Sequence, residues 1–138
     1  EMSQVFGKQA IVGSIDYRVV DGSYKVYVDG GKTPTNIDPF DWSKEIEKLG
    51  VGEILLQNID RDGTGKGYDI DTLSKVCSLT SIPVIALGGV GKYEHYIDAV
   101  KAGASAVSSA NIWHFKEMAD YFGKLILKEN SIPVRMDR

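Results

Sequence analysis

The chain has 138 residues, of which 43% are hydrophobic and 25% are charged. This composition is typical of one soluble globular domain and excludes a disordered or fibrous chain. Lysine and arginine number 16 against 19 aspartates and glutamates, and the net charge of -3 gives no electrostatic reason to expect nucleic acid or a membrane as partner. Any phosphate site must therefore be local.

The single cysteine, Cys77, excludes an internal disulfide and lies on an apolar helical stripe, where we expect it in the core. No apolar run is long enough to span a bilayer or to act as a secretion signal. These features favour a cytoplasmic protein. Residues 3–6 have the character of a helix end leading into a strand at 8–15, which indicates a chain that begins mid-protein.

Apolar runs bounded by turn residues predict four strands buried on both faces, as in a parallel sheet. They cover residues 10–15, 53–59, 83–87 and 104–107. Stretches with helical periodicity follow each strand and continue to about Asn130, so the order is strand then helix, four times. This order predicts an α/β fold with right-handed crossovers in a single domain, residues 1–138.

Local signals mark where several elements begin and end. Asp38 can cap a helix that has Pro39 at its first position and ends at Gly50, with Trp42, Ile46 and Leu49 on one stripe. Asp69 can cap the next helix. A β-hairpin is expected in the long loop after the first strand, from residues 17–20 and 24–28 with Asp-Gly turns. The last helix is expected to carry the apolar stripe Phe115, Met118, Ala119, Phe122 and Ile126.

Four βα units form only half of a TIM (β/α)8 barrel, because eight are needed for closure. Four units leave two open edges and one uncovered face of the sheet. We therefore expect either an N-terminal half-barrel or a second copy of the chain to cover this face, so that the chain alone is not a monomer.

Functional groups of such proteins lie after the carboxyl ends of the strands. Asp16 ends the first strand, where its carboxylate can exchange a proton with substrate, although a turn or capping role is the alternative. Gly63, the pair Gly88 and Gly89, and the small residues Ala110 and Asn111 can expose backbone N–H groups to an anion. For the glycines, a plain tight turn is the alternative.

Other polar residues give weaker indications of a functional site. Asp60 and Asp62 share one loop, but an aspartate-rich turn often bonds only its own amides, so we expect no metal and no cofactor. His95 follows Glu94 on a helix and is expected to face solvent. His114 is expected to help begin the final helix.

Together these segments resemble the cyclase family of imidazole glycerol phosphate synthase. The motifs are Ser-Ile-Asp at 14–16, Gly-Glu-Ile-Leu-Leu at 52–56, Ile-Asp-Arg-Asp-Gly-Thr at 59–64 with Gly-Tyr-Asp at 67–69, Pro-Val-Ile-Ala at 83–86 with Gly-Gly at 88–89, and His-Phe at 114–115. The resemblance covers essentially the whole chain. Its most specific part is the 59–69 loop.

The resemblance implies an enzyme that adds glutamine-derived ammonia to a phosphoribulosyl formimino-aminoimidazole carboxamide ribonucleotide in histidine biosynthesis. It makes Asp16 the catalytic aspartate of this half, while the aspartate of the other half has no counterpart here. It places a substrate phosphate against Gly63, Gly89, Ala110 and Asn111, and makes Asp62 a binding residue. Glu53 matches a residue at the bottom of the barrel, where ammonia enters from a glutaminase subunit.

Some positions differ from the biosynthetic pattern. Gln57-Asn58, Leu87 and Asn111 stand where smaller or hydroxyl residues are expected around the mouth, and Tyr17 follows the catalytic aspartate. Such changes fit a paralogue that works with an amidotransferase to make acetamidino sugars for surface polysaccharide. A further alternative is a non-catalytic half-barrel that binds phosphate and self-associates.

Overall fold

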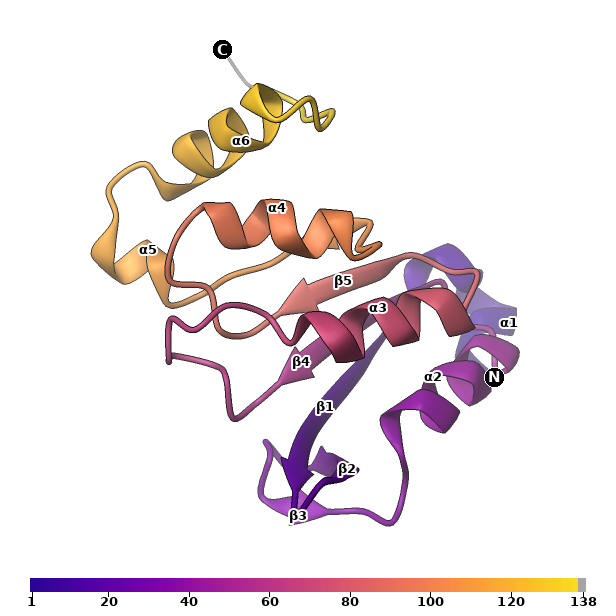
Figure 1. Cartoon of the computed structure of the whole chain (residues 1–138). Helices are drawn as coiled ribbons and strands as arrows, with labels where there is room; N and C mark the ends of the chain where they lie inside the picture. Colours follow the sequence, from indigo (N-terminus) through magenta and orange to yellow (C-terminus); the bar gives the residue numbers. More distant parts are fainter. Residues whose placement is uncertain (137–138) are drawn as a thin grey trace.

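The computed structural model describes residues 1–136 and shows an α/β fold in which the longer helices lie on one side of a sheet (Figure 1). The strands are β1 (Val12–Val20), β2 (Ser23–Val28), β3 (Thr33–Pro34), β4 (Glu53–Asn58), β5 (Val84–Leu87) and β6 (Ala106–Val107). The helices are α1 (Met2–Phe6), α2 (Pro39–Lys48), α3 (Ile70–Leu79), α4 (Glu94–Lys101), α5 (Ile112–Phe115) and α6 (Ala119–Glu129), with a 3₁₀ turn at Lys8–Ala10.

The six strands form one open sheet in the order β3-β2-β1-β4-β5-β6. β1, β4, β5 and β6 are parallel, and the β2–β3 hairpin adds antiparallel pairing to β1. Asp16 lies beside Gln57, and Gln57 lies beside Leu87. The carboxyl ends of the strands therefore meet at one edge, as expected of half a barrel.

The two faces of the sheet differ sharply in exposure. Ile15, Ile54 and Val84 face the helices and are at most 2% exposed. Side chains alternate along a strand, so Ser14, Leu55, Ile85 and Ala106 lie on the opposite face, which we call the inner face, and are only partly covered or exposed. The register thus places the apolar residues Leu55, Ile85 and Ala106 on the inner face. Val12, which is 52% exposed, lies on the same face at the start of β1.

Strand edges also remain open within residues 1–136. β1 pairs with β2 only from Asp16 onward, so residues 12–15 have a strand partner on the β4 side alone. β6 pairs with β5 and with no second strand. The expected half-barrel with a hairpin in its first loop is therefore confirmed. In this described part, no helix has both the length and the apolar character needed to cross a membrane.

The local signals for helix ends are confirmed. The Asp38 carboxylate accepts a hydrogen bond from the Phe40 amide at 2.7 Å, with Pro39 at the first helical position. α2 ends at Lys48, and Gly50 follows with a φ of 92°, a conformation that favours glycine. Asp69 caps α3. Cys77 is half-buried and packs against the core.

Three expectations about element boundaries and packing were wrong. Residues 8–10 form a 3₁₀ turn instead of strand, and β1 continues without a break into the hairpin. The last helical segment is split, because Met118 adopts a left-handed φ of 50° between α5 and α6. Phe115, Met118 and Phe122 are exposed instead of buried, and so is Leu49 at the end of α2.

The packing of β4 against the helices predicts the cost of a truncation. Ile54→Ala should reduce the free energy of unfolding by about 2–5 kcal/mol, because Ile54 is fully buried and its truncation leaves a cavity. Leu49→Ala is the control, since Leu49 is 61% exposed and should lose at most about 0.5 kcal/mol. Urea unfolding measures both, and equal losses would contradict the assignment of faces.

Candidate active site

Asp16 lies at the carboxyl end of β1 on the inner face, where it is half-buried. The Ser14 hydroxyl, on the same face of the same strand, donates a hydrogen bond to Asp16 Oδ1 at 2.9 Å. Sequence reasoning did not assign Ser14 a part in the site. The alternation of a strand places residues i and i+2 together, and that was the available signal.

The neighbour of Asp16 across the sheet is Gln57, and it connects β4 to the following loop. Gln57 Nε2 donates to Asp62 Oδ2 at 3.3 Å. Gln57 is therefore the neighbour of Asp16 in the sheet and a hydrogen-bond partner of Asp62 in the loop. Leu87 lies on the same face beside Gln57, so both residues line the mouth as expected.

Tyr17 and Asn58 point the other way. The expectation that Gln57 and Asn58 both line the mouth is therefore wrong for Asn58, because consecutive strand residues face opposite sides. Asn58 is 7% exposed and Tyr17 is 1% exposed, on the helix side of the sheet.

The glycines of the third loop pack against the second loop. The Gly67 amide donates to the Gly89 carbonyl at 2.7 Å, and a Cβ on Gly89 would collide with the Gly67 carbonyl. A Cβ on Gly88 would lie 2.9 Å from the Asn58 carbonyl, and both glycines have a positive φ near 95°. The tight-turn interpretation of these glycines is thus supported by geometry, and a side chain here would displace the second loop.

A shallow cavity of about 220 Å³ brings together four of the residues predicted from sequence. Its lining is Asp62, Gly63, Ala110, Asn111 and His114. Gly88 and Gly89 lie outside this lining, behind the second loop. His114 belongs to the short helix α5, separate from the final helix, and its place beside Asn111 was not foreseen.

Glu53 lies far from this cavity, at the amino-terminal end of β4 beside Val12. It is half-buried on the inner face, at the opposite end of the sheet from Asp16. The structure therefore separates Glu53 from the other predicted site residues, as its position along the strand requires.

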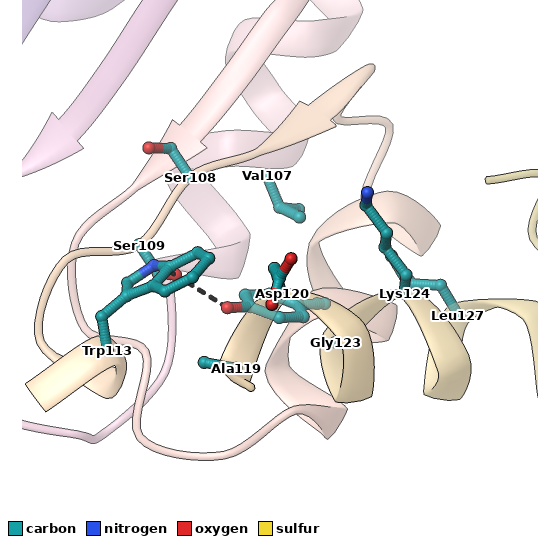
Figure 2. A pocket seen from close by; sticks show the side chains of 10 residues that line it. Val107, Ser108, Ser109, Trp113, Ala119, Asp120, Gly123, Lys124 and Leu127 are labelled. Atoms are coloured by element: carbon teal, nitrogen blue, oxygen red, sulfur yellow. Dashed lines mark hydrogen bonds between the residues drawn. The ribbon is translucent and has the colours of Figure 1, made fainter. Parts of the chain in front are cut away.

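A second cavity, of about 250 Å³, lies on the other side of β6 and contains none of the predicted site residues (Figure 2). Val107 points toward it, with Ala119 and Gly123 of α6 opposite. Ser109 accepts a hydrogen bond from Trp113 Nε1 at 3.2 Å and shares another with the Tyr96 hydroxyl at 2.7 Å. The residues that line this second cavity lie around β6, at the open edge of the sheet.

His95 is buried, with 9% of its surface exposed, so its expected solvent-facing position was wrong. The Gly91 amide donates to His95 Nδ1 at 3.3 Å, and Gly67 of the second loop lies against the ring. Burial lowers the pKa of His95 below its ordinary value, and nearby Lys92 adds to this effect, while Asp98 and Glu94 oppose it.

Among residues 1–136, no group of three or more histidine, cysteine, aspartate or glutamate side chains is arranged to hold a metal ion. The chemical groups at this edge of the sheet are the carboxylates of Asp16 and Asp62, the amide side chains of Gln57 and Asn111, and glycine-rich backbone. This set can bind an anion through N–H donors and can transfer a proton through Asp16.

A parallel sheet with such groups at its carboxyl edge defines the class of barrel-type βα proteins. The chain belongs to the family described as Histidine biosynthesis protein, whose model matches residues 1–119. The motifs at 14–16 and 59–69 that carried the resemblance lie within this match.

Several curated relatives are named imidazole glycerol phosphate synthase subunit HisF. The chain is 46% identical to the one from Hydrogenobaculum sp. over 138 residues, covering 99% of this chain and 55% of the relative. It is 45% identical to that of Pyrobaculum aerophilum over 98% of this chain and 53% of the relative, and 44% identical to that of Thermotoga sp. over 99% and 54%. The chain thus spans about half the length of these relatives.

The burial of His95 predicts a pH effect on folding. Because its folded pKa lies below the ordinary 6.5, the contribution of His95 to stability is fully present above pH 6.5 and declines as the pH falls toward the folded pKa. An NMR titration of the buried His95 imidazole should give a midpoint below pH 6.5, and Lys92→Ala should raise this midpoint. A midpoint at or above 6.5 would contradict the burial.

Proposed function

We propose that this chain supplies one half of the ammonia-using cyclase of imidazole glycerol phosphate synthase. The observation that carries the proposal is the position of Asp16 beside Gln57, because Gln57 binds Asp62, and Asp62 borders the cavity with Gly63, Ala110 and Asn111. A proton-transfer group and a small anion cavity then share one edge of the sheet. The identity of about 45% with the named relatives supports the same conclusion.

In this proposal the substrate is a phosphorylated ribonucleotide, and its phosphate occupies the cavity. Gly63, Ala110 and Asn111 present backbone donors, while the absence of a side chain on Gly63 leaves room for close approach. Gly88 and Gly89 support this subsite by docking the second loop. Asp62, held by Gln57, accepts hydrogen bonds from hydroxyl or amide groups of the substrate.

Asp16 acts as the general acid/base in ring closure. A carboxylate at the end of a strand, held by Ser14 and open to the mouth, can take a proton from the attacking ammonia and return it to the leaving group. Glutamine-derived ammonia would arrive from a glutaminase subunit and enter near Glu53, at the opposite end of the inner face. The relatives' name as a subunit supports a partner of this kind. We place the reaction in the cytoplasm, without a cofactor.

The inner face requires a second half to complete the barrel. Val12, Leu55, Ile85 and Ala106 leave apolar surface uncovered, and residues 12–15 of β1 and the outer side of β6 offer free strand edges. We propose that four more βα units, from an N-terminal half-barrel or a second copy, cover this face. Such a half would also provide a second aspartate at the mouth.

The comparisons give no support to the alternative in surface-polysaccharide amidation or to a purely non-catalytic fragment. The relatives described above all carry the histidine-pathway name. The differences at Tyr17 and Asn58, which favoured a paralogue, involve side chains that face away from the mouth.

The proposal predicts the effect of Asp16→Asn when the second half of the barrel is supplied. Ammonia-dependent turnover of the formimino ribonucleotide should fall by about 10²–10⁴-fold, because the amide cannot transfer the proton. Asp29→Asn is the matched control: Asp29 lies on the hairpin with a φ of 56°, which asparagine tolerates, and turnover should not change. Turnover of the Asp16 variant within a few-fold of the parent, with folding intact, would reject the assignment.

A further inference from the structure

Two side chains next to the mouth residues belong to the helix side of the sheet. Tyr17 follows Asp16 on β1, and Asn58 follows Gln57 on β4. Tyr17 and Asn58 are neighbours in the strand register, and both are almost fully buried. β1 and β4 therefore each present one polar side chain to the mouth and the next polar side chain to the interior.

Both buried side chains bind the same carboxylate oxygen. Asp69 Oδ2 accepts the Tyr17 hydroxyl at 2.9 Å and Asn58 Nδ2 at 3.1 Å. The Thr72 hydroxyl donates to the same oxygen at 2.9 Å, and Asp69 is the N-cap of α3. One carboxylate thus joins β1, β4 and the start of α3.

Asn58 also holds the beginning of the loop that Asp69 ends. Asn58 Oδ1 accepts the amides of Asp60 and Arg61 at 3.1 and 3.2 Å, while its Nδ2 donates to Asp69. A single buried side chain therefore ties the two ends of the 59–69 loop together. Inside the loop, Arg61 Nη1 donates to the Tyr68 carbonyl at 3.0 Å, which closes it further.

The loop is fixed to the rest of the sheet on its outer side as well. The Tyr68 hydroxyl donates to the Ser108 carbonyl at 2.8 Å, and the Gly67 amide bonds Gly89. The exposed residues 62–64 at the tip, with Asp62 and Gly63, project from this anchored base. The position of the tip then depends on how firmly the base is held.

We propose that Tyr17, Asn58 and Asp69 are positioning residues that fix the 59–69 loop, and with it Asp62 and Gly63, relative to Asp16. This inference rests on the proposed function for the roles of Asp16 and the cavity. Tyr17 is the long-range member, since 52 residues separate it from Asp69. Burial and the adjacent Asp69 raise the pKa of Tyr17, so its hydroxyl remains a donor at neutral pH.

Tyr17→Phe tests the proposal, because it removes the hydroxyl and keeps the ring that fills the core. Loss of one hydrogen bond to the partly buried Asp69 carboxylate should speed backbone amide exchange at residues 63–67 by roughly tenfold. The affinity for inorganic phosphate, measured by amide chemical shifts, should fall severalfold. The matched control is Tyr27→Phe on the hairpin, whose ring packs against Arg18 at 5.0 Å and whose loss of a hydroxyl should change neither quantity.

Asn58→Asp gives a second, pH-dependent test. At neutral pH the carboxylate introduced at position 58 would repel Asp69. The backbone amides of the 59–69 loop should then exchange faster than in the parent, after correction for intrinsic exchange rates. At acidic pH the protonated carboxyl regains a donor, so part of the protection should return. If the Asn58 side chain only filled space, the protection of the loop amides would not return at acidic pH.

Two results would overturn the proposal. One is loop exchange in Tyr17→Phe that matches the Tyr27→Phe control. The other is an increase that is uniform over β1, β4 and the loop, which would mean a loss of global stability only. Failure of the parent to bind phosphate would instead reject the phosphate cavity of the proposed function, and the exchange rates alone would then decide this inference.

Discussion

The structure depends above all on the parallel register of β1, β4 and β5, which sets Asp16 beside Gln57 and Gln57 beside Leu87. This register brings the strand ends to one edge, and alternation then divides each consecutive pair of side chains between two faces. The side chains of Asp16 and Gln57 face the mouth, whereas those of Tyr17 and Asn58 face the core. One register therefore specifies both the site and the network behind it.

The 59–69 loop gives the carboxyl edge of the sheet a defined shape. Asn58 ties its two ends, Asp69 caps α3, and Gly67 and Gly89 allow two loop backbones to touch. A side chain on Gly89 would break this contact, so the glycine is needed for packing before any ligand is considered. Under the proposed function, preorganisation of this kind would lower the entropic cost of holding an anion at the tip.

Features governed by neighbouring residues were predictable from the sequence, including the Asp38 and Asp69 caps, the hairpin and the alternation of strands and helices. The cavity that joins Asp62 and Gly63 to Ala110 and Asn111 followed from the rule that strand ends converge. The burial of His95 did not, because it arises where Gly67 of a distant loop crosses the ring. The break at Met118 depends on a single backbone conformation that the apolar periodicity does not encode.

These four βα units form one half of a barrel, and we propose that a second half covers their inner face. Burial of each large aliphatic side chain on that face contributes roughly 1.5–3 kcal/mol, so several together supply a driving force for association comparable with a domain stability of about 5–15 kcal/mol. Sedimentation equilibrium of the 138-residue chain tests this most directly. We expect reversible association at micromolar concentration, whereas a compact, cooperatively folded monomer under the same conditions would show that the inner face needs no second half.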